Sequence, residues 1–278
     1  MEKDIVSTKK EFRNPFPATG KVFKYEMLSM SRIFVPLFLA LIGMSLVIGL
    51  SVNTDFFIKG KSLASDAPNV FMTIFYMLFT ILCTVSAVVL LVVIEKRFKK
   101  TMLGDEGYLN LTFPVTIGEH LWGRYFANIV WCLAYGLTML IALALITIKG
   151  WKYISYAEIV KFCDGFREET GMSLFNGILI ALSNILSFFM LICTFAYFTH
   201  SLINIFGTKK KLLELLVFAV FFIIFVNIYR LIYRPLLNAD YEKIGQIPFW
   251  ISVLYNLIWA TLFSLGTRFI LNNKLNLE

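Results

Sequence analysis

Residues 95–125 read EKRFKKTMLGDEGYLNLTFPVTIGEHLWGRY and separate two hydrophobic segments that are too long for the core of a soluble domain. Four basic residues lie close together in 96–100, where they suit a helix C-terminus and anionic headgroups. Gly104 and Gly107 flank two acidic residues, and this pattern predicts that the preceding helix ends here. Thr116 and Glu119 have the spacing of a capping box, which predicts that the next helix begins at this point.

Between the two glycines and Pro114, the stretch carries the apolar residues Tyr108, Leu111 and Phe113. A solvated loop needs none of them, and exposed apolar residues held between turns commonly mark a contact surface. We therefore interpret 95–125 as a cytoplasmic loop that binds another protein. Contact with lipid is the alternative interpretation.

The composition of the whole chain indicates an all-α integral membrane protein. Of its 278 residues, 58% are hydrophobic and only 16% are charged, against about a quarter charged in soluble domains. A helix of about 20 residues crosses the hydrocarbon core of a bilayer. The sequence predicts a flexible N-terminus over 1–20 and one transmembrane domain over 21–278. The six predicted spans are about 33–54, 68–94, 121–148, 172–198, 212–229 and 246–268.

The segment before the first span is amphipathic. Phe23, Met27, Met30 and Phe34 recur on one helical face, and basic residues occupy the other. We interpret 21–34 as an interfacial helix lying along the membrane. The alternative is a simple extension of the first span.

The distribution of basic residues predicts the orientation in the membrane. With the N-terminus inside, 17 of the 26 Lys and Arg residues lie on the cytoplasmic side. Both termini and the 95–125 stretch are therefore predicted to be cytoplasmic. Residues 149–171 and 230–246 are then external. Part of the first, 149–169, is expected to form a short helix lying on the membrane, and the second is either a membrane-dipping elbow or an ordinary loop.

Several functional classes lack support in the sequence. The four cysteines and two histidines have no spacing typical of a metal site, and neither a phosphate-binding loop nor a nucleophile motif is present. The positive charge reflects topology, so nucleic-acid binding is not expected. His200, Glu214 and Arg230 lie near predicted span ends, where we interpret them as interfacial. Neutral polar residues within spans are expected to join helices, and lining a path is the alternative: Asn176, Ser183, Asn184, Ser187 and Asn256.

Four stretches resemble permease subunits of the type 2 class of ABC exporters found in Gram-positive bacteria. They are LGDEGYLNLTFPVTIGEHLWGRY (103–125), KYEMLSMSRIFVPL (24–37), THSLINIFGTKKK (199–211) and KLNLE (274–278). The long 149–169 segment departs from the short loop usual in this family.

The resemblance implies a six-helix permease in the bacterial cytoplasmic membrane, paired with a second permease subunit as a homodimer or heterodimer. It also implies a separate cytoplasmic ATPase that holds ATP and Mg, so that this chain carries no cofactor and is not itself an enzyme. A coupling helix at about 96–108, within the loop 96–114, would seat in that ATPase. The implied coupling residues are Arg97, Lys100, Leu103, Gly104, Asp105, Glu106, Gly107 and Tyr108, and the interfacial helix contributes Lys24, Glu26 and Arg32.

The expected function is thus the export of an amphipathic cargo such as a peptide, a drug or a lipid-like molecule. Spans without fixed charges suit such a cargo. Two alternatives stay open: a non-transporting sensor or assembly subunit, and a membrane enzyme that modifies lipid.

Overall fold

All the regular structure in the described part of the chain is helical. The computed structural model describes residues 16–51, 67–104, 106–107, 115–149, 151, 155–205, 210–237 and 246–273. The helices are α1 (Phe16–Ser51), α3 (Ala67–Phe98), the π-helical turn η1 (Lys99–Leu103), α5 (Ile117–Ile146), α6 (Tyr156–Thr170), α7 (Leu174–Ile205), α8 (Lys210–Leu237) and α10 (Ile247–Asn273). This confirms the predicted all-α class.

Five helical stretches in these ranges are long and apolar enough to cross a membrane. They are Ala18–Ser51, Thr73–Leu103, Ile117–Ile146, Leu174–Ile205 and Ile247–Asn273. The chain is therefore a multi-pass membrane protein. The remaining predicted span, 212–229, lies in α8, where the described apolar run Leu216–Ile232 is shorter. The prediction of six spans thus stays open at α8.

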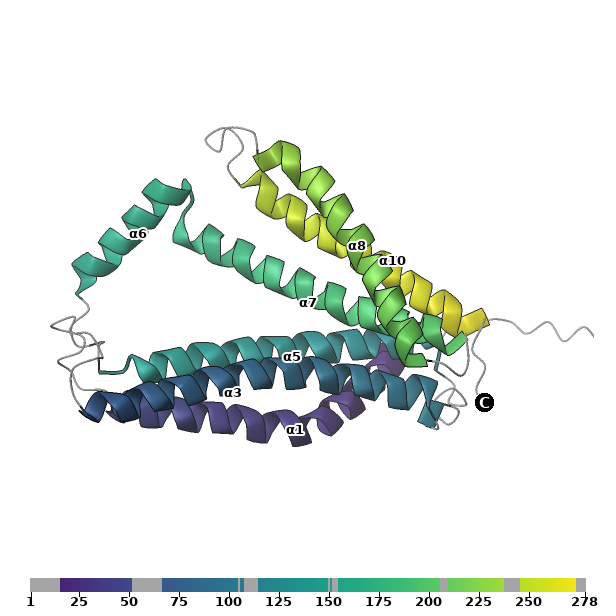
Figure 1. Cartoon of the computed structure of the whole chain (residues 1–278), viewed down its shortest axis with the longest axis horizontal. Coiled ribbons are helices and arrows are strands. Elements are labelled where there is room, and N and C mark those ends of the chain that lie inside the picture. Colours follow the sequence, from purple (N-terminus) through teal and green to yellow (C-terminus); the bar gives the residue numbers. More distant parts are fainter. Residues whose placement is uncertain are drawn as a thin grey trace, which may run out of the picture.

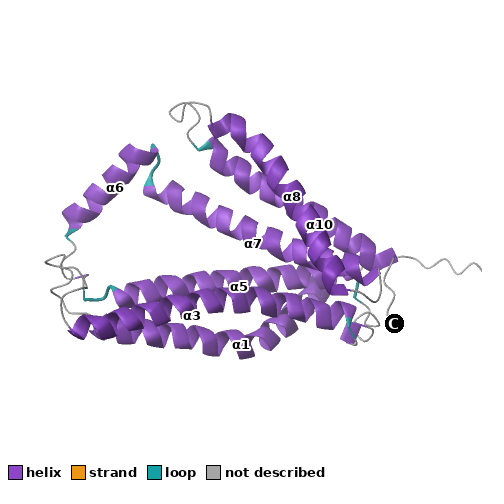
Figure 2. Ribbon diagram, viewed as in Figure 1, coloured by secondary structure: helices purple, strands orange, loops and turns teal. Residues whose placement is uncertain are grey.

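The helices form two groups that meet at one end of the molecule (Figure 1). α1, α3 and α5 run side by side, and α1 packs most extensively on α5. In the second group, α7 packs on α10, and α8 lies against both. We call the end where α3 finishes and α5 begins the loop end. The groups diverge toward the opposite end, where α6 connects α5 to α7, and we call this the α6 end (Figure 2).

The N-terminal segment is not a separate interfacial helix, because α1 continues without a break through residues 21–34 into the predicted first span. Met30 and Phe34 are fully buried and Met27 packs against them, so the predicted apolar face is covered by protein. Pro36 therefore lies inside the helix and not in its first turn. Proline removes one helical hydrogen bond and bends a helix, and α1 is bent beyond its purple N-terminal part (Figure 1).

Glycines let the backbones of α1 and α5 approach closely. A Cβ atom on Gly49 would collide with the carbonyl oxygen of Leu145, and one on Gly123 would lie 2.9 Å from the Val22 side chain. Between these two points, the Phe34 ring meets Trp131 edge-on at 4.9 Å. Small residues at helix contacts and large aromatic residues between them are typical of packing within membranes.

The second helix group is joined by the neutral polar residues singled out in the sequence. The buried Asn256 side chain on α10 donates a hydrogen bond to the Ser187 hydroxyl on α7, at 3.3 Å. Asn184 donates to the carbonyl oxygen of Phe249, at 3.4 Å. The predicted helix-joining role is confirmed for these residues, whereas the hydroxyl of Ser183 donates only to its own helix.

Two helices extend beyond their predicted ends. α7 continues to Ile205, and residues 199–201, expected at an interfacial end, are buried there. α8 runs through Pro235 to Leu237, and the rest of the predicted elbow, 238–245, lies outside the described residues. The short helix expected within 149–169 is present as α6.

Candidate functional site: the charge cluster at the loop end

A buried charge cluster joins α1, α3 and α5 at the loop end. Glu26 of α1 accepts a hydrogen bond from Arg97 Nε at 2.8 Å, and its other carboxylate oxygen lies 3.3 Å from Arg124 Nη2. The Glu26 and Arg124 side chains are only 6% and 4% exposed. Arg97 also donates to the hydroxyl of Ser29. One carboxylate of α1 thus holds the last turn of α3 and the second turn of α5 together.

The cluster is sensitive to the loss of its single carboxylate. Two guanidinium groups share Glu26, and the Nε and Nη1 atoms of Arg124 have no hydrogen-bond partner among the residues that the structure describes. Removing one partner of a buried ion pair costs about 3–5 kcal/mol, because the other charge is then buried without compensation. Glu26 therefore stabilises the position of both arginines.

Aromatic side chains close the cluster on the side of α7. The Arg124 guanidinium lies 6.0 Å from the centre of the Phe98 ring, which stacks on Tyr197 at 3.9 Å. The Tyr197 hydroxyl accepts a hydrogen bond from the Asn128 amide at 2.9 Å, inside the protein. A cation over an aromatic face is stabilised by the quadrupole of the ring. The stack thus connects the charge cluster to α7.

A second polar contact joins the two helix groups. His200 on α7 lies 2.8 Å from the carboxylate of Glu95 on α3, and the histidine side chain is only 5% exposed. The interpretation of His200 as an interfacial side chain is therefore wrong. Through this contact, the end of α3 is attached to α7 as well as to α1 and α5.

The helix before the loop ends as a compact turn. α3 passes into η1, which stops at Gly104, and the Gly107 N–H donates to the Gly104 carbonyl oxygen at 2.7 Å. A Cβ on Gly107 would lie 2.7 Å from the Met102 carbonyl oxygen, so a larger residue there would force the turn apart. At the surface, Lys100 Nζ bonds Glu106 Oε1 at 2.7 Å. This hydrogen bond and the lysine charge lower the pKa of the Glu106 carboxyl below its ordinary value.

The predicted coupling residues fall into three groups in the structure. Arg97 belongs to the charge cluster, with 28% of its side chain exposed. Lys100, Leu103, Gly104, Glu106 and Gly107 form the turn that follows α3. Asp105 and Tyr108 lie outside the described residues, as do Leu111 and Phe113. Binding to an ATPase therefore stays a prediction for this loop.

Of the three residues assigned to the interfacial helix, only Glu26 belongs to the cluster, and Lys24 and Arg32 are exposed. After the loop, the predicted capping box is confirmed. The Thr116 N–H donates to Glu119 Oε2 at 2.7 Å, and the Glu119 N–H donates to the Thr116 hydroxyl at 3.3 Å, so that α5 begins at Ile117.

Sequence reasoning missed Arg124, Glu95 and the aromatic stack. One signal was available: Glu26 is an acidic residue on a segment whose other charges are basic, and Arg124 is a lone charge within the predicted third span. Each is costly inside a membrane helix bundle unless it is paired. That pairing could have been proposed from the sequence.

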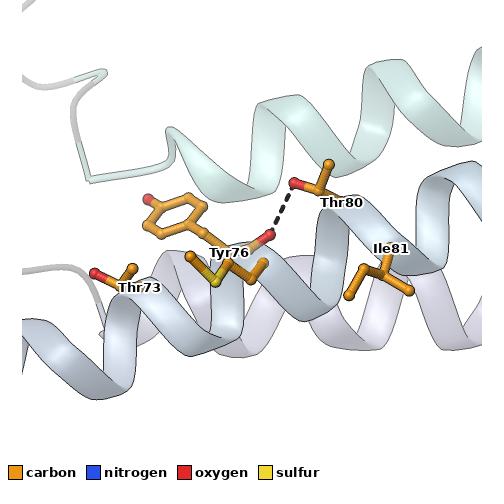
Figure 3. A pocket seen from close by; sticks show the side chains of 5 residues that line it. Thr73, Tyr76, Thr80 and Ile81 are labelled. Carbon is orange, nitrogen blue, oxygen red and sulfur yellow. Dashed lines mark hydrogen bonds between the residues drawn. The ribbon is translucent and has the colours of Figure 1, made fainter.

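A shallow depression of about 430 Å³ lies on α3, toward the end opposite the loop (Figure 3). It is lined by Thr73, Tyr76, Met77, Thr80 and Ile81, and the Thr80 hydroxyl donates to the Tyr76 carbonyl oxygen at 2.9 Å. The lining is mostly apolar, so the depression suits an acyl chain or a neighbouring helix. It is remote along α3 from the charge cluster.

Within the described residues, no group of three or more His, Cys, Asp or Glu side chains could hold a metal ion. In comparisons with known proteins, the chain matches no protein-family model, no curated protein and no solved structure. The resemblance to exporter permeases therefore rests on the sequence stretches alone.

Proposed function

We propose that this protein is the membrane-spanning permease subunit of an ATP-driven ABC exporter and that a separate cytoplasmic ATPase binds at its loop end. The observation that carries the proposal is the sharing of Glu26 between Arg97 and Arg124. A partner that pushes on the turn after α3 would move three helices together through this carboxylate. The Glu95–His200 contact would pass part of that movement to α7.

The charge distribution is in keeping with an external energy source. The ion pairs described above lie at the loop end and not in the middle of the spans. Carriers coupled to ions or protons keep ionisable groups at mid-membrane, where they are costly. Ion pairs that lie, among the described residues, at the loop end fit a transporter whose energy comes from an ATPase on another chain. The proposed cargo is amphipathic, and a second permease subunit would complete the path.

The proposal is tested by mild-detergent purification of the tagged protein from its native membrane, followed by mass spectrometry. We expect an ABC ATPase to co-purify with the wild-type protein and to be lost with Glu106→Ala or Tyr108→Ala. Glu168→Ala is the matched control, since Glu168 is an exposed acidic residue on α6. The Glu168→Ala variant should retain as much ATPase as the wild-type protein. Absence of an ATPase from every preparation would contradict the proposal.

Transport by the purified complex separates the proposal from its alternatives. Vesicles that contain the permease and its ATPase should accumulate a fluorescent amphipathic peptide only with ATP and Mg. An intact complex that hydrolyses ATP but moves no peptide, drug or lipid would favour a sensor or assembly subunit. ATP-independent turnover of membrane lipid would favour the enzyme.

A further inference from the structure

The helix α6 exposes an apolar face that the protein itself does not cover. Tyr156, Ile159 and Phe162 are 82%, 50% and 65% exposed, and α6 contains no buried residue. At 100° per residue, one side carries Tyr156, Ile159, Val160 and Cys163, with Phe162 and Phe166 at its edge. Arg167 projects from the same side in the last turn of α6, where its long side chain can extend to the headgroups. The opposite side carries Lys161, Asp164 and Glu168. An uncovered apolar face of this kind requires an occupant.

The position of α6 in the chain identifies the occupant. Nine residues separate α5 from α6 and three separate α6 from α7, and both neighbours are candidate membrane spans. Its 15 residues extend over roughly 22 Å, which is too short to cross a hydrocarbon core of about 30 Å. α6 is therefore held beside the surface of the bilayer. Trp151, exposed in the connection from α5, is a residue type common at that level.

The direction of α6 is fixed at both ends. The Ser155 hydroxyl accepts from the Glu158 N–H at 3.3 Å, and the Ser155 N–H donates to Glu158 at 2.9 Å, which completes a capping box. At the other end, Gly171 adopts a positive φ of 67°, and its N–H donates to the Arg167 carbonyl oxygen. The Phe166 ring lies over Gly177 of α7, where a Cβ would be 2.7 Å from the ring. The Gly171 turn and the packing of Phe166 on Gly177 hold α6 at a set angle to α7.

We propose that α6 lies in the interface of the membrane, with the face of Tyr156, Ile159 and Phe162 among the lipid acyl chains and the face of Lys161 and Glu168 in water. Interfacial helices usually carry basic polar faces that bind anionic lipid, whereas α6 has four acidic and two basic residues. The flanking spans tether α6 to the bilayer, so attraction to anionic headgroups is unnecessary. Its insertion should not depend on anionic lipid.

The test measures the accessibility of spin labels on the full-length protein in phosphatidylcholine vesicles. The four native cysteines are first replaced by alanine. Single labels are placed at Ile159→Cys and Lys161→Cys, two residues apart on opposite faces. The first should be accessible to oxygen and protected from a water-soluble nickel complex, at a depth of about 5–10 Å. The second should show the reverse. Both results should persist when phosphatidylglycerol is added.

Three outcomes would overturn the proposal. Nickel access at both labels would place α6 in water. Protection of Ile159 from both reagents would mean that protein covers the face. Spin–spin broadening that disappears on dilution with unlabelled protein would identify a second copy as the occupant. Thermal unfolding of each labelled protein establishes that the fold is intact before the accessibilities are compared.

Discussion

The two ends of the molecule differ in the kind of contact that their side chains make. At the loop end, the buried Glu26 carboxylate is shared by the buried Arg124 and the partly exposed Arg97, and aromatic rings pack against Arg124. At the α6 end, the helix groups diverge (Figure 1), and the connecting helix exposes apolar side chains. Buried ion pairs demand fixed geometry, whereas an apolar face in lipid tolerates many arrangements. The difference indicates that the loop end sets the positions of the two helix groups relative to each other and that these groups are least constrained against each other at the α6 end.

The largest expected effect comes from removing the shared carboxylate. Glu26→Ala should destabilise the protein by about 3–5 kcal/mol, because Arg124 is left buried and unpaired. Thermal unfolding in detergent measures the change. Replacing Glu26 and Arg124 together by leucine and methionine should cost less than Glu26→Ala alone. Equal melting temperatures for Glu26→Ala and wild type would mean that the cluster does not hold the loop end together.

A close helix contact near the α6 end provides the next effect. Gly49→Ala places a methyl group against the Leu145 carbonyl oxygen and should cost about 1–3 kcal/mol. Gly43→Ala is the matched control, since a Cβ there meets nothing within 4 Å and alanine favours the helix. The melting temperature should fall for the first variant and stay or rise for the second. The same response in both would show that α1 and α5 do not approach closely at Gly49.

The aromatic stack gives a smaller effect. Tyr197→Phe keeps the ring on Phe98 but removes the oxygen that accepts from Asn128, leaving a buried donor unpaired. The expected cost is about 1–2 kcal/mol in thermal unfolding. Tyr156→Phe removes a hydroxyl from an 82% exposed side chain on α6 and should change nothing. If Tyr156→Phe lowered the stability more than Tyr197→Phe, the side chains of the α6 end would be more tightly bound than those of the loop end, which would contradict the account.

The smallest effect belongs to the exposed ion pair. Lys100 lowers the pKa of Glu106 in the folded protein, so the pair stabilises the turn above the unfolded pKa of the carboxyl. This contribution is lost as the pH falls through the folded pKa. Glu106→Gln should lower stability by no more than about 0.5 kcal/mol at neutral pH. The melting curves of wild type and variant should converge in acid, and a difference that grows in acid would contradict the pairing.

The sequence predicted the features of the fold that depend on local signals. Long uncharged runs predict the helices. Thr116 and Glu119 predict the start of α5, and Gly104 predicts the end of the helical stretch after α3. The continuity of α1 is the alternative that the sequence left open, because the apolar face over 21–34 has the same pattern whether lipid or protein covers it. Only the packing of Met30 and Phe34 distinguishes the two cases.

The candidate site was harder to predict because its contacts join distant parts of the chain. Glu95 and His200 are 105 positions apart, and no local spacing connects them. The resemblance implies that Arg97 contacts an ATPase, and no local pattern indicates that it also binds Glu26. A charged residue near the end of a predicted span has the same local pattern whether it faces water, lipid or another helix. Tertiary packing decides among these.

The most direct test of the account follows the movement from the loop end to the α6 end. Spin labels at Leu143→Cys on α5 and Ile178→Cys on α7, both exposed, report the separation of the two helix groups toward the α6 end. Their distance is measured by pulsed electron paramagnetic resonance in the complex with its co-purifying ATPase. We expect ATP and Mg to change this distance in the otherwise wild-type protein, and the change to be largely lost with Arg97→Met. A distance that is the same with and without ATP, or an unchanged response in Arg97→Met, would contradict the account.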